Sequence, residues 1–102
     1  MGEVPVACTL TDDRLAARKN GLLAAIVALS TTQTKLPTGY RLEFPGTPDT
    51  LVRIAEMIDA ERKCCRFLRF TLTVAPNFGP IALELSGPEG TREFLESLLE
   101  LA

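Results

Sequence analysis

The residues best suited to chemistry in this sequence are the adjacent cysteines Cys64 and Cys65, which follow Glu61 in the stretch ERKCC. The third cysteine, Cys8, lies near the start of the chain. Three sulfurs brought together from these two segments would suit a mercuric, arsenite or cuprous ion, because thiolates prefer soft ions. Structural zinc usually needs four ligands, and the chain has no histidine to complete such a set. Glu61 is the candidate fourth ligand or an outer partner of the thiolates.

The same cysteines fit two other roles. Free cysteine behaves as a small apolar residue and is often buried, so Cys8 and Cys65 are also candidates for the hydrophobic core. Alternatively, Cys64 is the nucleophile of a thiol enzyme, activated by basic neighbours such as Arg62 and Arg66. The absence of histidine weighs against an enzyme, because histidine is the commonest general base and activator of cysteine.

Composition narrows the class of protein. Apolar residues make up 46% of the chain and charged residues 24%, which is typical of a globular domain. The formal net charge is −2 and there is no basic run, so nucleic acid is not an expected partner. No apolar stretch approaches the ~20 residues of a membrane span, and the first residues lack the basic start of a signal peptide. We therefore expect a cytoplasmic protein with reduced thiols and no membrane partner.

Apolar periodicity predicts the elements that would position the cysteines. Alternating apolar residues predict four strands, at 4–10, 40–44, 66–74 and 81–86. Apolar residues at helical spacing predict three helices, at 11–30, 47–65 and 87–102. Thr47 followed by Pro48 is a typical helix start, with threonine as the N-cap. The segment 31–39 is expected to be a loop.

Each predicted element has one apolar face. The core-facing residues expected on the first two helices are Leu15, Leu22, Ile26, Leu29, Leu51, Ile54, Ala55 and Ile58. Those expected on the strands include Tyr40, Leu42, Phe44, Leu68, Phe70, Leu72, Val74, Ile81, Leu83 and Leu85. Successive helical residues rotate by ~100°, so Cys65 would face the core while Cys64 would lie on a flank. The two thiols could share one ion only if the helix ended between them.

The elements predict a single α+β domain over residues 1–102, in the order strand, helix, strand, helix, strand, strand, helix. Because each strand has one apolar and one polar face, we expect a two-layer sandwich, a four-stranded mixed sheet with three helices on one face. The residues expected on the opposite face include Arg41, Arg69, Thr71 and Glu84. A thioredoxin-like fold is the alternative, since it has the same order of elements but helices on both faces.

Two stretches, ERKCCRFLRFTLTV and IALELSGPEGTREFL, resemble a group of small uncharacterised bacterial proteins. Their shared pattern is E-x-x-C-C-x-F-L-x-F, then a strand, then G-P-x-G and a helix, and similar segments occur with mercury-type metal-responsive regulators. The residues that match are Glu61, Cys64, Cys65, Phe67 and Phe70. Arg66 stands where proline is expected in that group, which puts a rigid turn after the cysteines in doubt. The resemblance implies an association with metal but no settled activity, and this chain has no DNA-binding helix pair.

Three functional hypotheses follow, in order of preference. The first is a small cytoplasmic protein that binds a thiophilic metal or metalloid through Cys64 and Cys65, with Cys8 as a third sulfur and Glu61 beside them. The second is a homo-oligomeric interaction domain, such as a homodimer, whose cysteines are structural. The third is a thiol enzyme with Cys64 as the nucleophile.

Overall fold

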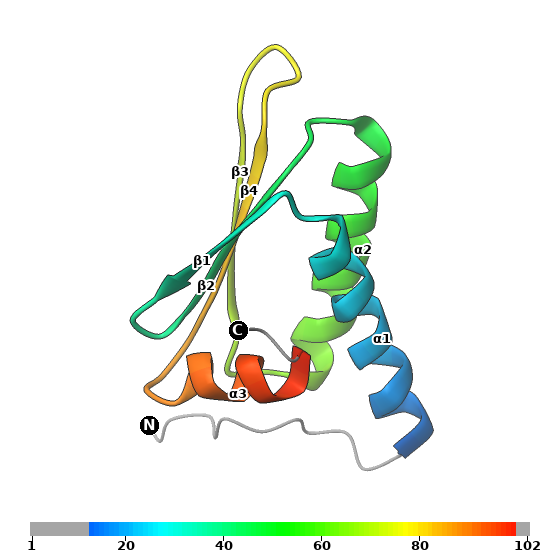
Figure 1. Cartoon of the computed structure of the whole chain (residues 1–102). Coiled ribbons are helices and arrows are strands. Elements are labelled where there is room, and N and C mark those ends of the chain that lie inside the picture. Colours follow the sequence, from blue (N-terminus) through cyan, green and yellow to red (C-terminus); the bar gives the residue numbers. More distant parts are fainter. Residues whose placement is uncertain (1–12, 100–102) are drawn as a thin grey trace.

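The structure, a computed structural model, describes residues 13–99 (Figure 1). Its elements, in chain order, are α1 (Asp13–Leu29), β1 (Thr32–Leu36), β2 (Gly39–Phe44), α2 (Pro48–Cys64), β3 (Arg69–Val74), β4 (Ile81–Ser86) and α3 (Thr91–Leu99). The expected strand 4–10 lies outside the described residues, together with Cys8. The same is true of the side chains at 13–20, 64, 98 and 99, and hence of Leu15.

The predicted α+β class is confirmed: residues 13–99 contain three helices and a four-stranded sheet, in which β2, β3 and β4 were predicted as strands and β1 was not. The strands form one sheet in the order β1-β2-β4-β3, and every pair in it is antiparallel. The expectation of a mixed sheet is therefore wrong for the described residues. The expected loop at 31–39 is also wrong, because it contains β1 and the tight turn into β2. Every residue of Thr32–Leu36 except the last is polar, so the segment lacks the alternation of apolar and polar residues that predicts a strand.

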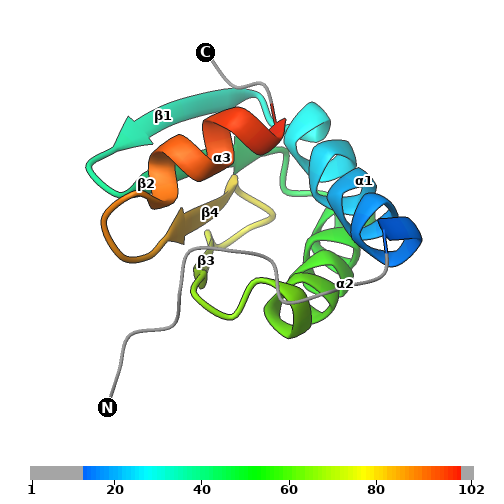
Figure 2. The same ribbon diagram turned by 90° about the horizontal axis from the view of Figure 1, so that it is seen from below.

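The helices lie on one side of the sheet, as expected (Figure 1). Figure 2 shows α3 against β2, with α1 packed beside α2. On the opposite face, the strand register aligns Arg41, Glu84 and Thr71 in one row. Arg41 Nη1 forms an ion pair of 3.1 Å with Glu84 Oε2 across this row. Within residues 13–99 no helix covers this face, so the thioredoxin-like alternative finds no support.

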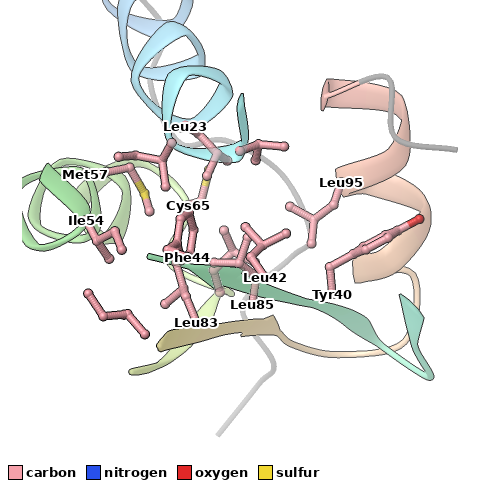
Figure 3. Close-up of a cluster of buried hydrophobic side chains, with 14 of the residues drawn as sticks. Leu23, Tyr40, Leu42, Phe44, Ile54, Met57, Cys65, Leu83, Leu85 and Leu95 are labelled. Atoms are coloured by element: carbon pink, nitrogen blue, oxygen red, sulfur yellow. The ribbon is translucent and has the colours of Figure 1, made fainter. Parts of the chain in front are cut away.

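One hydrophobic core joins the helices to the sheet (Figure 3). The sheet side chains predicted to face the helices are buried on the two central strands, namely Tyr40, Leu42, Phe44, Ile81, Leu83 and Leu85. The helices add Leu23, Ile26, Val27, Ile54, Met57 and Leu95. The inward residues of the central strands were predictable because each of these strands lies between two others and has one face fully covered by the helices.

The helix faces were predicted less well. On α1, Ile26 is buried as expected, but Leu22 and Leu29 are exposed, and Leu23 and Val27 are buried instead. The apolar residues of this helix occur on all sides of it, so their periodicity does not select one buried face. On α2, Ile54 is buried as expected, whereas Leu51 and Ile58, also expected in the buried stripe, are half-buried against the core. Ala55 is exposed and Met57 occupies the core, because α2 also packs against α1 on that flank.

The β3 residues that were expected to point inward lie on the predicted face of the sheet, but they are only partly buried. Phe70, Leu72 and Val74 are aligned with the buried Leu85, Leu83 and Ile81 of β4. Nevertheless, Leu72 is 37% exposed and Val74 is 51% exposed. The reason is position, since β3 is at the edge of the described sheet and has a neighbouring strand on one side only.

Candidate functional site

Helix α2 positions the candidate residues at its C-terminal end. The helix begins as predicted: Thr47 is the N-cap, its Oγ1 accepts a hydrogen bond of 3.4 Å from Thr50 N–H, and Pro48 is the first helical residue. Its last helical residue is Cys64. Cys65 has the non-helical angles φ −103° and ψ 77°, and its N–H donates the final helical hydrogen bond, of 2.7 Å, to Glu61 O. Helical geometry therefore stops between the two cysteines.

Cys65 is fully buried and belongs to the hydrophobic core (Figure 3). Its thiol also has a polar contact, because Sγ donates to Glu61 Oε2 over 3.6 Å. The carbonyl of Cys65 accepts a hydrogen bond of 3.1 Å from Leu68 N–H, which turns the chain towards β3. Cys65 is therefore both a residue of the hydrophobic core and a candidate site residue.

Glu61 is a carboxylic acid with no solvent exposure. Moving a carboxyl group out of water costs several kcal/mol unless hydrogen bonds or ions compensate it. Aliphatic side chains of similar size fill such positions at lower cost. The spacing of four residues places Glu61 one turn before Cys65 on the same side of α2, so this contact was predictable from the sequence.

The basic residues beside the cysteines are directed to solvent. Arg62 Nη2 lies 2.7 Å from Asp59 Oδ1, and Lys63 Nζ lies 3.3 Å from Asp59 Oδ2. These hydrogen bonds hold the pKa of the Asp59 carboxyl below its usual value. Arg66 is exposed as well. The hypothesis of a nucleophile activated by Arg62 gains no support from these contacts.

The segment after Cys65 is held against the stretch GPEG that precedes α3. The rings of Phe67 and Phe94 meet edge to face, with centroids 5.1 Å apart. A Cβ atom at Gly87 would lie 2.9 Å from Phe67 O and 2.6 Å from Thr91 Oγ1, so only glycine allows this close approach. The two halves of the pattern noted in the sequence therefore touch, two residues after Cys65.

Of the four predicted metal ligands, the structure brings Glu61 and Cys65 together. It places the backbone of Cys64 at the helix end, while the Cys64 side chain and Cys8 lie outside the described residues. Among the side chains that the structure describes, no three of histidine, cysteine, aspartate and glutamate are grouped to hold a metal ion. The three-sulfur site therefore stays a prediction.

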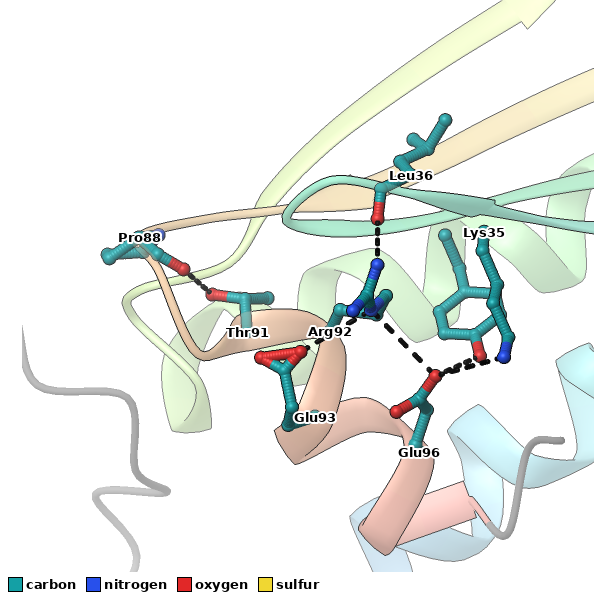
Figure 4. Close-up of polar contacts among 8 residues, drawn as sticks. Lys35, Leu36, Pro88, Thr91, Arg92, Glu93 and Glu96 are labelled. Carbon is teal, nitrogen blue, oxygen red and sulfur yellow. Dashed lines mark hydrogen bonds and ion pairs between the residues drawn. The ribbon is translucent and has the colours of Figure 1, made fainter.

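A second polar cluster, missed in the sequence, joins α3 to the β1–β2 hairpin (Figure 4). Tyr40 OH donates a hydrogen bond of 2.6 Å to Glu96 Oε2, and Lys35 Nζ and Arg92 Nε each lie 3.9 Å from that oxygen. Arg92 Nη1 also donates to Leu36 O over 3.4 Å. Burial, and then the bond to Glu96, raise the pKa of Tyr40 to about 12. The only sequence signal was the spacing of four between Arg92 and Glu96.

Two surface hollows lie away from the cysteines. One of about 300 Å³ runs between α1 and α2, beside Ile26 and Met57. The other, of about 440 Å³, lies between the start of α2 and the tip of the β3–β4 hairpin, beside Leu51, Val74 and Phe78. Neither hollow is lined by Glu61 or Cys65.

Comparison of the chain with protein-family models, with curated proteins and with solved structures found no match. Among the described helices, none combines the length and the apolar character needed to cross a membrane.

Proposed function

We propose that this protein binds a thiophilic metal or metalloid ion at the C-terminal end of α2, in the reducing cytoplasm. Cys64 and Cys65 would supply the sulfurs, with Glu61 beside them and Cys8 as the third thiolate. The observation that carries the proposal is the end of helical geometry between Cys64 and Cys65. Adjacent residues inside a helix diverge by ~100°, and the departure of Cys65 from helical angles is the feature that would let the two thiols turn towards one ion.

The contact between Glu61 and Cys65 gives the proposal a chemical basis. A thiol must lose its proton before its sulfur binds an ion. Glu61 Oε2 already accepts the hydrogen bond from the Cys65 thiol, so a carboxylate there is placed to receive that proton as the metal–sulfur bond forms. The same oxygen is close enough to act as a ligand or as an outer partner of the bound ion. The resemblance to segments found with mercury-type regulators agrees with a soft ion.

The test is native mass spectrometry of the full chain with mercuric ion. Single thiols also bind mercury, so the sample should contain a large excess of a monothiol, which competes with isolated cysteines but not with a chelating site. We expect one ion per chain that a dithiol removes. We also expect Cys64→Ser and Cys65→Ser each to release the ion to the monothiol, while Cys8→Ser decides whether a third sulfur takes part.

Two results would contradict the proposal. The wild-type chain loses all mercury to the monothiol, or the single substitutions at Cys64 and Cys65 retain it as the wild type does. Circular dichroism of each variant separates loss of the site from loss of the fold. Zinc serves as the control ion, because a site without histidine should prefer a soft ion.

The second candidate function is the homo-oligomeric interaction domain with structural cysteines. The burial of Cys65 in the core favours it, because a core thiol needs no ligand to explain it. Under this hypothesis Cys65→Ser lowers stability, Cys64→Ser leaves it unchanged, and neither alters ion binding.

A further inference from the structure

The two edge strands of the described sheet differ in how they meet solvent. β1 and β3 are the edges. β1 exposes polar side chains, including Lys35, and a proline follows it. β3 exposes Leu72 and Val74, and the hairpin beyond it carries Phe78, which is 83% exposed. Three of the six large apolar side chains exposed in the described part of the chain therefore lie on one hairpin.

The β3 edge also lacks the features that usually prevent edge-to-edge pairing. Natural edge strands carry lysine, proline or a bulge, which block a second strand. From Phe70 to Val74 there is no charged residue and no proline, and β3 pairs with β4 residue by residue without a bulge. The strand is thus regular, apolar on one face and uncharged through its middle.

We propose that β3 pairs antiparallel with β3 of a second copy of this chain, about a two-fold axis at Leu72, and so joins two sheets into one. Opposite residues in an antiparallel pair point to the same face. In this register Phe70 lies opposite Val74 of the partner subunit, and Thr71 lies opposite Thr73 of the partner subunit. The apolar face of each strand therefore continues into the other.

The positions of the arginines favour this register. A two-fold axis at Arg69 would place two positive charges opposite each other, which destabilises a strand pair. With the axis at Leu72, Arg69 lies opposite Ala75 of the partner subunit. No two charges within the paired strands then face each other.

The conformation of the hairpin tip is consistent with such a contact. Asn77 and Phe78 both have positive φ, of 58° and 54°, a region that residues other than glycine rarely adopt. The backbone of the tip packs closely on Gly46, where a Cβ atom would meet Phe78 O and Gly79 O. The exposed Phe78 ring, and not backbone strain, is what a partner subunit would cover.

The expected association is weak. A standard interface uses about 20–30 residues a side, whereas this one uses residues 69–75 of each copy. We therefore expect a dimer that dissociates at micromolar concentration. The pairing uses neither Cys64 nor Cys65, so it does not depend on the proposed ion site.

Sedimentation equilibrium of the metal-free, reduced full chain tests the proposal, from low micromolar to several hundred micromolar protein. We expect the wild type to pass from monomer to dimer over this range, and Leu72→Lys to weaken the dimer by at least about tenfold, because a lysine edge resists pairing. Gln33→Lys on the β1 edge is the matched control and should dimerise as the wild type does. Val52→Lys, which removes an exposed apolar residue from α2, is the second control.

Amide hydrogen exchange locates the contact independently of stability. The amides of β3 should become more protected as concentration rises, while those of β1 should not. A wild type that stays monomeric at every concentration overturns the proposal. Protection of the β3 amides that does not change with concentration also overturns it, because another part of the same chain, such as residues 1–12, would then cover the edge. A dimer that persists unchanged in Leu72→Lys would place the interface elsewhere and also overturn it.

Discussion

Glu96 and Glu61 each occupy a helix that packs on the same sheet, yet their surroundings differ. The Glu96 side chain is 27% exposed, accepts a hydrogen bond from Tyr40 OH, and has Lys35 and Arg92 within 3.9 Å. Glu61 has no exposure, and the thiol of Cys65 donates to it from 3.6 Å. The first carboxylate keeps contact with water and cations. The second lies inside the core beside a soft sulfur atom.

The difference separates a structural carboxylate from a candidate functional one. A partly exposed carboxylate with a hydrogen bond and two cations contributes to stability at small desolvation cost. A fully buried carboxyl group carries a large desolvation cost, and a well-packed apolar residue in its place is often neutral or stabilising. Selection for folding alone explains Glu96 well. For Glu61, the contact with the Cys65 thiol makes ion binding the role to test.

The sharpest test of this comparison is ion affinity. Glu61→Gln keeps the shape of the side chain but removes its charge and its capacity to take a proton. Partners of metal ligands typically contribute a factor of about 10–100 in affinity, so we expect a loss in that range for mercuric ion. Glu96→Gln is the matched control and should bind as the wild type does. Competition titration with a monothiol measures both, and equal affinities for the two variants would remove Glu61 from the site.

Replacement of each glutamate by methionine should change stability in different ways. Glu96→Met loses the hydrogen bond to Tyr40 and the two ion pairs, which we expect to lower the free energy of unfolding by about 1–2 kcal/mol. Glu61→Met keeps the volume and removes the desolvation cost together with the contacts of the carboxyl group, so we expect a change of less than about 1 kcal/mol in either direction. Urea unfolding of metal-free protein measures both. A larger loss for Glu61→Met would make Glu61 a structural residue.

A smaller effect should come from Tyr40→Phe, which deletes one hydroxyl group and leaves the ring in the core. We expect a loss of about 1 kcal/mol, the usual net contribution of a hydrogen bond. Tyr40→Phe combined with Glu96→Gln should be non-additive, because the two residues share that bond. Combined with Glu61→Gln it should be additive. Additivity in both cases would mean that the Tyr40–Glu96 bond contributes nothing to stability.

The last prediction concerns pH. The pKa of Tyr40 is raised to about 12, against an ordinary value of 10.0, so the folded state prefers the protonated phenol. The resulting stability is fully present below pH 10 and is lost as the pH rises from 10 to about 12. The stability advantage of the wild type over Tyr40→Phe should shrink over that interval. Tyr40 is the only tyrosine and tryptophan is absent, so phenolate absorbance should titrate in one step near pH 12. A midpoint near 10 would show that Tyr40 ionises as an exposed phenol does.

The fold was predicted correctly for the strands that have one face covered by helices and the other face exposed. Alternation in β2 and β4 identified the inward residues because apolar and polar positions are separated there by the pleat. β1 was missed because Thr32–Leu36 is polar on both faces and joins the sheet through its backbone. The buried face of α1 was predicted wrongly because the apolar residues of that helix occur on all its sides. In such segments the packing partner, and not the local pattern, decides burial.

The candidate site was predictable as far as local geometry reaches. The spacing of Glu61 and Cys65 indicated their contact, since residues four apart lie together on a helix. The same rule gave no sign that Cys65 would leave the helix, or that Phe67 would be held by Gly87. The contact of Tyr40 with Glu96 joins residues 56 positions apart, so it depends on how α3 docks on the sheet.

The hydrogen bond that closes α2 has a kinetic consequence. Cys65 N–H is held by Glu61 O at 2.7 Å, and the thiol behind it is fully buried. An alkylating reagent can therefore reach Cys65 only while the last turn of α2 is open. The alkylation rate of Cys65, divided by the rate for an unfolded thiol, then measures how often that turn opens. If opening is local, this ratio will exceed the fraction of globally unfolded chains, and Cys65 will report how often the proposed site opens to solvent.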